Sequence, residues 1–142
     1  MKNFDFPNFV LETPEDWFDV TADLDPGSPP TFMADDGLGE LQVSIEKIPG
    51  GKGVQFTPEQ LRGMLNEFAK GHDLGSPNNL SSAETPRSLL AANFVWNDDF
   101  LRVWYVSEPD QLAFITYTCE KNATFANELQ IVETIIRSLR FK

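Results

Sequence analysis

The chain has 142 residues, 41% of them apolar, and a formal net charge of −11, and these values exclude several classes of protein. Its twelve phenylalanines supply the apolar surface that a folded core requires, so the chain is not a disordered acidic tail. Its eleven basic residues are dispersed, which argues against a surface that tracks nucleic-acid phosphates. We expect a single domain over residues 1–142.

The first strands are short and are separated by proline-rich or glycine-rich turns. Residues 23–30 contain Asp25-Pro-Gly and Pro29-Pro30, which favour a loop. Asp36-Gly37 is a hairpin signal, because glycine takes a positive φ at no cost. The strand that returns from this hairpin alternates apolar and polar residues, so one of its faces should meet water. The predicted strands are 9–12, 17–21, 31–34 and 41–47.

Two amphipathic helices and three closely spaced strands follow a glycine-rich loop at 49–53. Thr57 caps a helix over 60–70, with Gln60 completing a capping box and Gly71 as the stop. Residues 75–85 are polar and are predicted to be a loop. The strands of the antiparallel meander are 89–96, 100–107 and 112–120, and the closing helix is 125–139.

This order predicts an α+β fold in which an antiparallel sheet of about six strands is covered by two amphipathic helices. The leading Phe9-Val-Leu-Glu-Thr-Pro-Glu-Asp-Trp17, the central helix, the aromatic strands and the closing Glu133-Thr-Ile-Ile-Arg-Ser-Leu139 resemble the PsbP, Mog1 and DcrB-like group. The resemblance implies a sandwich fold and a role in binding other proteins. It carries over no functional residue.

The negative charge is concentrated in the first third of the chain. Residues 1–46 hold eleven acidic side chains and one basic one, whereas residues 47–142 hold eleven acidic and ten basic ones. An acidic segment attracts cationic surfaces and repels nucleic acid and anionic membranes. We therefore expect a protein partner with a cationic surface, and no nucleic-acid or membrane partner. The acidic residues assigned to partner binding are Asp16, Asp19, Asp23, Asp25, Asp35 and Asp36.

The meander offers a second candidate surface. Alternation places Phe100, Arg102, Trp104 and Val106 on one sheet face and apolar residues on the other. Either helices and loops cover both faces, or one face stays open with the Trp and Arg enrichment of a binding hot spot. On the second alternative, Arg102 and Trp104 bind the partner.

No residue pattern specifies a reaction, so we assign no catalytic residue, metal ligand or cofactor. His72 is the only histidine and is expected in an exposed loop, and Cys119 is the only cysteine and is expected to be a small buried apolar residue. One His and one Cys are too few for a zinc site. The paired carboxylates Glu15-Asp16, Asp35-Asp36 and Asp98-Asp99 fall at turns, where solvated side chains are usual.

The leading interpretation is a non-enzymatic, acidic protein-binding module, such as a bacterial immunity-type or accessory factor that masks a cationic surface. The alternative is an enzyme or a small-ligand-binding protein with a pocket between the sheet and the helices. A lone cysteine forms no internal disulfide, and the chain has no apolar signal region and no stretch of roughly 18 apolar residues that could span a bilayer. We expect a cytoplasmic protein.

Overall fold

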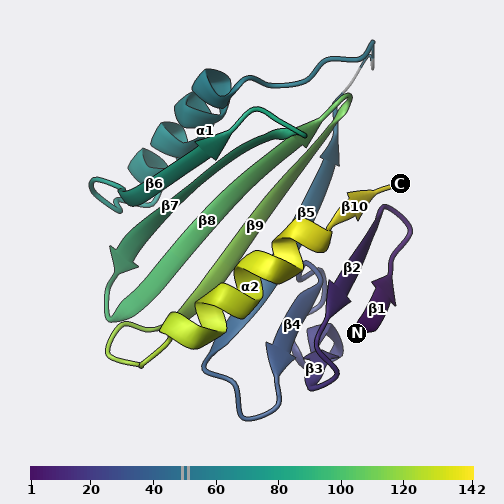
Figure 1. Ribbon diagram of the computed structural model, residues 1–142. Helices are drawn as coiled ribbons and strands as arrows, with labels where there is room; N and C mark the ends of the chain where they lie inside the picture. The colour runs from purple at the N-terminus through teal and green to yellow at the C-terminus, as the bar shows by residue number, and fades with distance from the viewer. Residues whose placement is uncertain (49, 51) are drawn as a thin grey trace.

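The structure is a computed structural model that describes residues 1–48, 50 and 52–142. Within those residues the chain forms ten strands and two α-helices (Figure 1). No helix of this described part is long and apolar enough to cross a membrane. The elements are β1 (Lys2–Asp5), β2 (Phe9–Thr13), β3 (Trp17–Asp19), the 3-10 helix η1 (Thr21–Asp23), β4 (Thr31–Ala34), β5 (Gly39–Lys47), α1 (Pro58–Gly71), β6 (Asn78–Ala83), β7 (Ser88–Trp96), β8 (Asp99–Glu108), β9 (Gln111–Glu120), α2 (Ala126–Ser138) and β10 (Arg140–Phe141).

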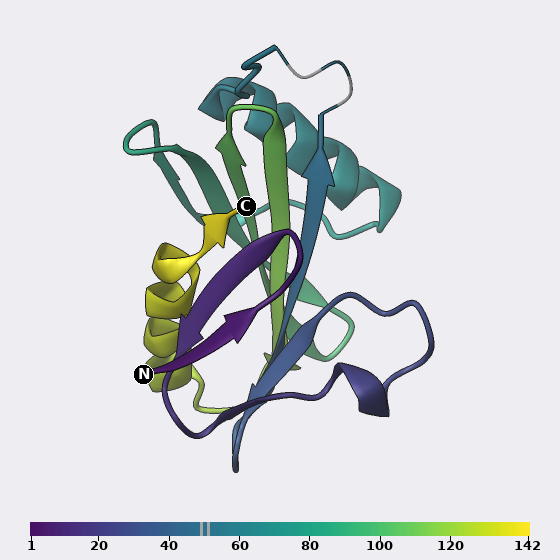
Figure 2. The same cartoon turned by 90° about the vertical axis from the view of Figure 1, so that its right-hand side faces the viewer.

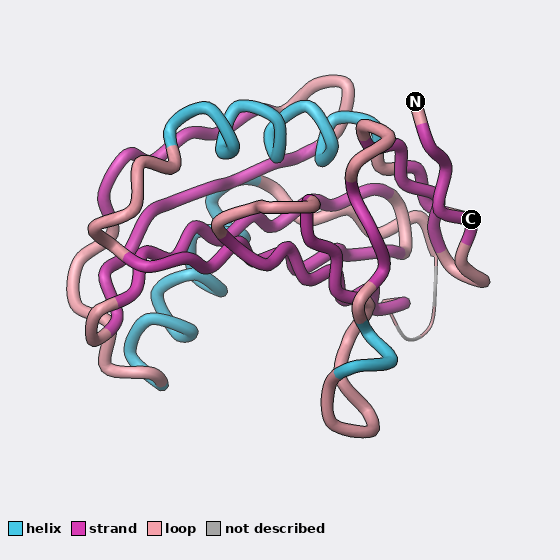
Figure 3. Tube along the Cα trace, turned by 90° about the horizontal axis from the view of Figure 1, so that it is seen from below, coloured by secondary structure: helices cyan, strands magenta, loops and turns pink. Residues whose placement is uncertain are grey.

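The strands form two antiparallel sheets, which confirms the predicted α+β sandwich. The large sheet has seven strands in the order β3-β4-β5-β9-β8-β7-β6, and the small sheet has three in the order β1-β2-β10. The helices α1 and α2 lie on opposite sides of the large sheet (Figure 3). The small sheet lies beside α2 (Figure 2), so β2 belongs to a different sheet from the other predicted strands.

Each face of the large sheet has its own apolar core, because residues alternate between the faces along a strand. On the α2 side, Trp104 and Ile115 pack with Val132 and Ile135 of the helix, all fully buried. On the α1 side, Leu61 and Leu65 pack against residues that include Leu90, Val103 and Tyr105. Both helices therefore turn the predicted apolar stripe toward the sheet, although Met64 and Phe68 of α1 are only partly buried.

The first residues of α1 adopt the predicted cap, whereas the residue that ends the helix differs from the predicted one. Thr57 Oγ1 accepts a hydrogen bond from Gln60 N at 3.2 Å, and the Gln60 side chain accepts one from Thr57 N at 2.9 Å, so the capping box is present. Gly71 is the last residue of the helix, but it does not take the left-handed conformation of a glycine stop. The positive φ that ends it, +54°, is taken by Asp73. The N–H groups of Asp73 and Leu74 then bond back to Lys70 and Ala69 in a Schellman arrangement.

Three further predictions need correction. Residues 78–83 form the edge strand β6 and not a loop; its side chains are all exposed, so no apolar alternation marks it. The short strands β1 and β10 were not predicted, because both depend on pairing with β2. In the β4–β5 hairpin the positive φ belongs to Asp36 and not to Gly37. The predicted loop at 49–53 includes residues 49 and 51, which lie outside the described residues.

Candidate functional site

The predicted water-facing side of β5 forms the floor of a groove on the α1 side of the large sheet. Gln42, Ser44 and Glu46 point to this side, and the register places them opposite Thr116, Phe114 and Leu112 of β9. Directly opposed residues of an antiparallel pair share a face. None of the three β5 side chains is buried, because α1 covers β7 and β8 and stops short of β5.

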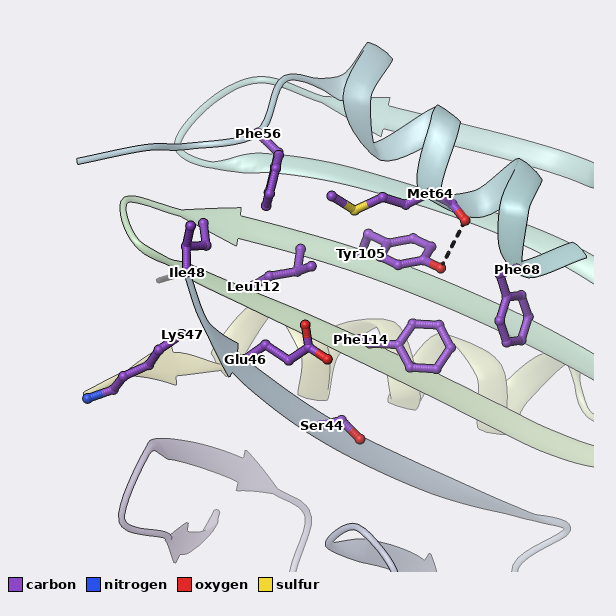
Figure 4. A pocket seen from close by; sticks show the side chains of 10 residues that line it. All are labelled: Ser44, Glu46, Lys47, Ile48, Phe56, Met64, Phe68, Tyr105, Leu112 and Phe114. Atoms are coloured by element: carbon purple, nitrogen blue, oxygen red, sulfur yellow. Dashed lines mark hydrogen bonds between the residues drawn. The ribbon is translucent and has the colours of Figure 1, made fainter. Parts of the chain in front are cut away.

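A cavity of about 510 Å³ lies between this floor and α1 (Figure 4). Met64 and Phe68 line it from the helix, and Phe56 lines it from the segment before the helix. On the sheet, the Phe114 ring lies 5.2 Å, centroid to centroid, from both the Phe68 ring and the Tyr105 ring. The walls are therefore mainly aromatic and aliphatic.

A second cavity of about 250 Å³ continues the first along the sheet. Both cavities share Ser44, Phe68 and Phe114, and the second extends to Trp96 and Pro29. Pro29 belongs to residues 20–30, the connection from β3 to β4 that contains η1. We call the two cavities together the α1 groove. Figure 3 shows α1 and the 20–30 connection projecting from the same face of the sheet.

The polar groups of the larger cavity are few, whereas the second cavity is also lined by Gln42, His72, Thr116 and Thr118. Burial raises the pKa of Tyr105 to about 12, and the nearby charge of Glu46 adds to the rise. The Tyr105 hydroxyl therefore stays protonated near neutral pH, and it donates to the backbone oxygen of Met64 at 3.5 Å. Glu46 and Lys47 are the charged lining residues, and both are exposed. This lining can hold an apolar group, and it offers no second carboxylate for acid and base roles.

The six aspartates assigned to partner binding are all exposed, and none of them lies within 4.0 Å of a cationic group among the described residues. They form two groups. Asp35 and Asp36 lie in the β4–β5 turn, and Asp16 of the β2–β3 turn is beside them, because Asp35 N donates to the backbone oxygen of Asp16 at 2.7 Å. Asp23 and Asp25 lie in the 20–30 connection, and Asp19 ends the strand before it. The second group is thus next to the α1 groove.

The structure corrects the assignment of Arg102 and Trp104 to partner binding. Trp104 is fully buried and Arg102 is 7% exposed, because α2 covers their face of the sheet. Arg102 Nε donates to one carboxylate oxygen of Glu133 at 2.9 Å, and Trp104 Nε1 donates to the other at 3.2 Å. Arg102 also donates to Asn93 Oδ1 at 2.7 Å and to Ser81 Oγ at 3.1 Å. Its guanidinium therefore joins α2 to the edge of the sheet.

The lone histidine and cysteine lie in different surroundings. His72 is exposed at the end of α1, where its ring lies 4.5 Å from the Phe68 ring and lines the second cavity. Cys119 is a buried free thiol whose pKa is raised, chiefly by burial. A thiol that stays protonated is a poor nucleophile. Among the described residues, no three His, Cys, Asp or Glu side chains converge as metal ligands.

The sequence analysis gave a pocket between the sheet and the helices as its alternative, but it named no residue of the α1 groove. Met64 and Phe68 belong to the apolar stripe of α1 and Phe114 belongs to a predicted strand, so none of the three was singled out as a site residue. The available signal was the polar face of residues 41–47, which shows that the sheet is uncovered at this strand. The width of the uncovered region depends on where α1 crosses the sheet, and that is a tertiary property.

No known family model matches the chain, and no curated protein matches it in sequence. Its structure is similar to the solution structure of cyanobacterial PsbP (CyanoP) from Synechocystis sp. PCC 6803, with a TM-score of 0.67. The match covers 99% of this chain and 92% of that chain at 12% sequence identity. Similarity at this identity shows the fold alone. The resemblance to the PsbP, Mog1 and DcrB-like group is therefore confirmed as a resemblance of fold.

Proposed function

We propose that this chain is a non-enzymatic binding module that masks a cationic surface on another protein, as a bacterial immunity-type or accessory factor. The observation that carries the proposal is the set of six exposed aspartates without a cationic neighbour. Carboxylates that are not neutralised within their own chain project their field into solvent and steer a cationic partner. The proposal places the protein in the cytoplasm, where a free thiol such as that of Cys119 stays reduced.

The surroundings of the titratable groups support a non-enzymatic role. An enzyme that uses acid and base catalysis places two titratable groups in one pocket and separates their pKa values. In the larger cavity of the α1 groove, Tyr105 is held protonated and Glu46 and Lys47 are exposed, and His72 lines only the second cavity. The buried charges on the other side of the sheet, such as that of Arg102, are used in structural hydrogen bonds.

A second candidate function is small-ligand binding in the α1 groove. The larger cavity, at about 510 Å³, lies within the usual range of ligand pockets, and its lining is mainly apolar. Such pockets fix the orientation of a ligand with several convergent polar groups. Here Glu46 and Lys47 are both at one end and both exposed, so this candidate ranks second.

Association kinetics test the first proposal. The protein is immobilised to capture basic proteins from its source cell, and the captured partner is then mixed with free protein in a stopped-flow instrument. We expect the on-rate to fall steeply as salt shortens the Debye length from about 10 Å at 0.1 M to about 3 Å at 1 M. A variant with Asp16, Asp19, Asp23 and Asp25 all changed to Asn should associate about tenfold more slowly at low salt.

The matched control removes the same amount of charge elsewhere. Its four changes are at exposed positions outside the acidic segment: Glu59→Gln, Glu67→Gln, Asp73→Asn and Glu84→Gln. This control should associate nearly as fast as the parent. An on-rate that is independent of salt, or equal in the parent and the four-aspartate variant, would contradict the proposal.

A further inference from the structure

We propose that the α1 groove receives an extended segment of the partner in which apolar side chains alternate with Lys or Arg. This inference rests on the proposed function, and it names the kind of partner segment and the place where it binds. The segment would lie over Ser44 and Phe114, with α1 on one side and the 20–30 connection on the other (Figure 3).

The shape of the α1 groove favours an extended occupant. Its two cavities, of about 510 and 250 Å³, are joined end to end through Ser44, Phe68 and Phe114. The floor consists of β5 and β9; β9 has strands on both sides, whereas β5 beyond Val43 is paired with β9 alone. Backbone N–H and C=O groups lie in the plane of a sheet, so an occupant that lies over its face binds through its side chains. In an extended segment alternate side chains point to one face, so successive apolar residues can enter neighbouring cavities.

The lining favours apolar side chains in the two cavities. Met64, Phe68 and Phe114 are only partly buried, although they pack against the core on the α1 side. Trp96 is 45% exposed at the far end. Partly exposed aromatic and methionine side chains that line one concavity are typical of binding surfaces, where aromatic residues and Met are enriched.

The charge beside the α1 groove favours basic residues between the apolar ones. The 20–30 connection holds Asp23 and Asp25, follows Asp19 and contains no basic residue. Glu46 and Lys47 line the opposite end of the groove, so the uncompensated negative charge lies at the end formed by the 20–30 connection. Lys and Arg side chains of a bound segment are long and flexible, so their charged ends can turn toward the 20–30 connection, whose Pro29 lines the second cavity, while their neighbours fill the cavities. An acidic segment or an anionic ligand would meet like charges.

Three synthetic peptides test the inference without knowledge of the partner. The first is acetyl-Lys-Leu-Lys-Phe-Lys-Leu-Lys amide, the second has Glu in place of every Lys, and the third has Ser in place of every apolar residue. Each is titrated into the ¹⁵N-labelled protein while amide resonances are followed by NMR. We expect the first peptide to bind at least about tenfold more tightly than the other two. The amide chemical-shift changes that the first peptide causes in the protein should map to β5, β9 and residues 20–30.

Two variants locate the binding. Ser44→Trp places a large ring in the part shared by both cavities, and Ser82→Trp places the same ring on the exposed edge strand β6 as a control. The first should lose binding of the basic apolar peptide by about tenfold or more, and the second should bind as the parent does. Far-ultraviolet circular dichroism checks that both remain folded. The peptide comparison, which uses the parent protein, tests the inference even if Ser44→Trp does not fold.

The outcomes separate this inference from the function on which it rests. Binding of the Ser-containing peptide as tight as that of the apolar one would overturn the groove inference and leave the acidic binding surface intact. Equal binding to the folded Ser44→Trp variant would do the same. Tighter binding of the Glu-containing peptide would contradict both. If none of the peptides binds, the inference is overturned, and the salt-dependent kinetics of the captured partner decide the proposed function separately.

Discussion

The two faces of the large sheet are closed in different ways. On the α2 side, helix carboxylates are hydrogen-bonded to the sheet. Glu128 Oε1 accepts from Gly39 N at 2.9 Å and from the Tyr117 hydroxyl at 2.8 Å, and Glu133 accepts from Arg102 and Trp104. On the α1 side, one side-chain hydrogen bond joins helix and sheet among the described residues, that from Tyr105 to the Met64 backbone at 3.5 Å.

The protein therefore has two kinds of charged side chain: those that are hydrogen-bonded between helix and sheet, and those that are exposed and available to a partner. The carboxylates of Glu128 and Glu133 accept hydrogen bonds from donors of the sheet, and these bonds fix the position of α2. Arg87 has a similar role, because it donates to the backbone oxygens of Ile136 and Leu139 at the end of α2. Of the aspartates in and before the 20–30 connection, Asp19 accepts hydrogen bonds only from its neighbour Thr21, and none lies within 4.0 Å of a cationic group among the described residues. The α2 side therefore holds carboxylates that join helix to sheet, whereas the α1 side carries a partly exposed apolar groove.

Two aromatic truncations should show the largest contrast between the faces. Trp104→Ala removes a fully buried ring and leaves Glu133 without one donor, so we expect the free energy of unfolding to fall by about 3 to 5 kcal/mol. Phe114→Ala removes a partly buried ring at the α1 groove and should cost about 1 to 2 kcal/mol. Urea unfolding measures both. Equal losses of unfolding free energy would show that the Phe114 ring is packed as tightly as the Trp104 ring.

The two tyrosines lie on opposite faces, and both are held protonated. Burial is the main reason that the pKa of Tyr105 is raised to about 12; burial and the hydrogen bond to Glu128 raise the pKa of Tyr117 further. The unfolded value is about 10. Folding therefore gains stability from these groups below pH 10, and this contribution is lost as pH rises from about 10 through 12. For Tyr105 alone we expect about 2 to 3 kcal/mol.

Absorbance at the tyrosinate wavelength checks this, since the chain has two tyrosines. The folded protein should show little tyrosinate at pH 10.5, whereas the protein in urea should titrate near pH 10. A folded protein that titrates one tyrosine near pH 10 would show that one of the two faces is more open to water than the structure indicates.

Sequence patterns predicted the elements whose signals are local. The capping box at Thr57 and the alternation of residues 41–47 each depend on a few neighbouring residues. Elements that depend on distant pairing were missed, as β10 shows. The residues of the candidate binding surfaces were predicted only in part, for the same reason. The acidic residues follow from composition, whereas alternation placed Arg102 and Trp104 on one face and could not show that α2 covers it.

Gly39 and Gly63 leave very different amounts of room for a side chain. A Cβ at Gly39 would lie 2.5 Å from the Thr118 oxygen and 2.7 Å from the Tyr117 ring, so Gly39→Ala should cost about 1 to 3 kcal/mol. A Cβ at Gly63, on the exposed side of α1, would meet nothing within 4 Å. Because Ala is the better helix former, Gly63→Ala should stabilise by about 0.5 to 1 kcal/mol. Thermal melts of the two variants should shift in opposite directions. A shift in the same direction would show that the space around one of the two glycines differs from that in the structure.

The smallest effect on stability is expected from the acidic residues that we assign to binding. Changing Asp16, Asp19, Asp23 and Asp25 to Asn alters the net charge from −11 to −7 and removes no buried contact, since all four are exposed. Asn keeps the acceptor that Asp19 offers to Thr21 N at 2.9 Å. The free energy of unfolding should therefore stay within about 0.5 kcal/mol of the parent, and any change should be a gain from reduced self-repulsion. A loss of several kcal/mol would show that these carboxylates build the fold, as Glu128 and Glu133 do, and would remove the distinction between the two sides.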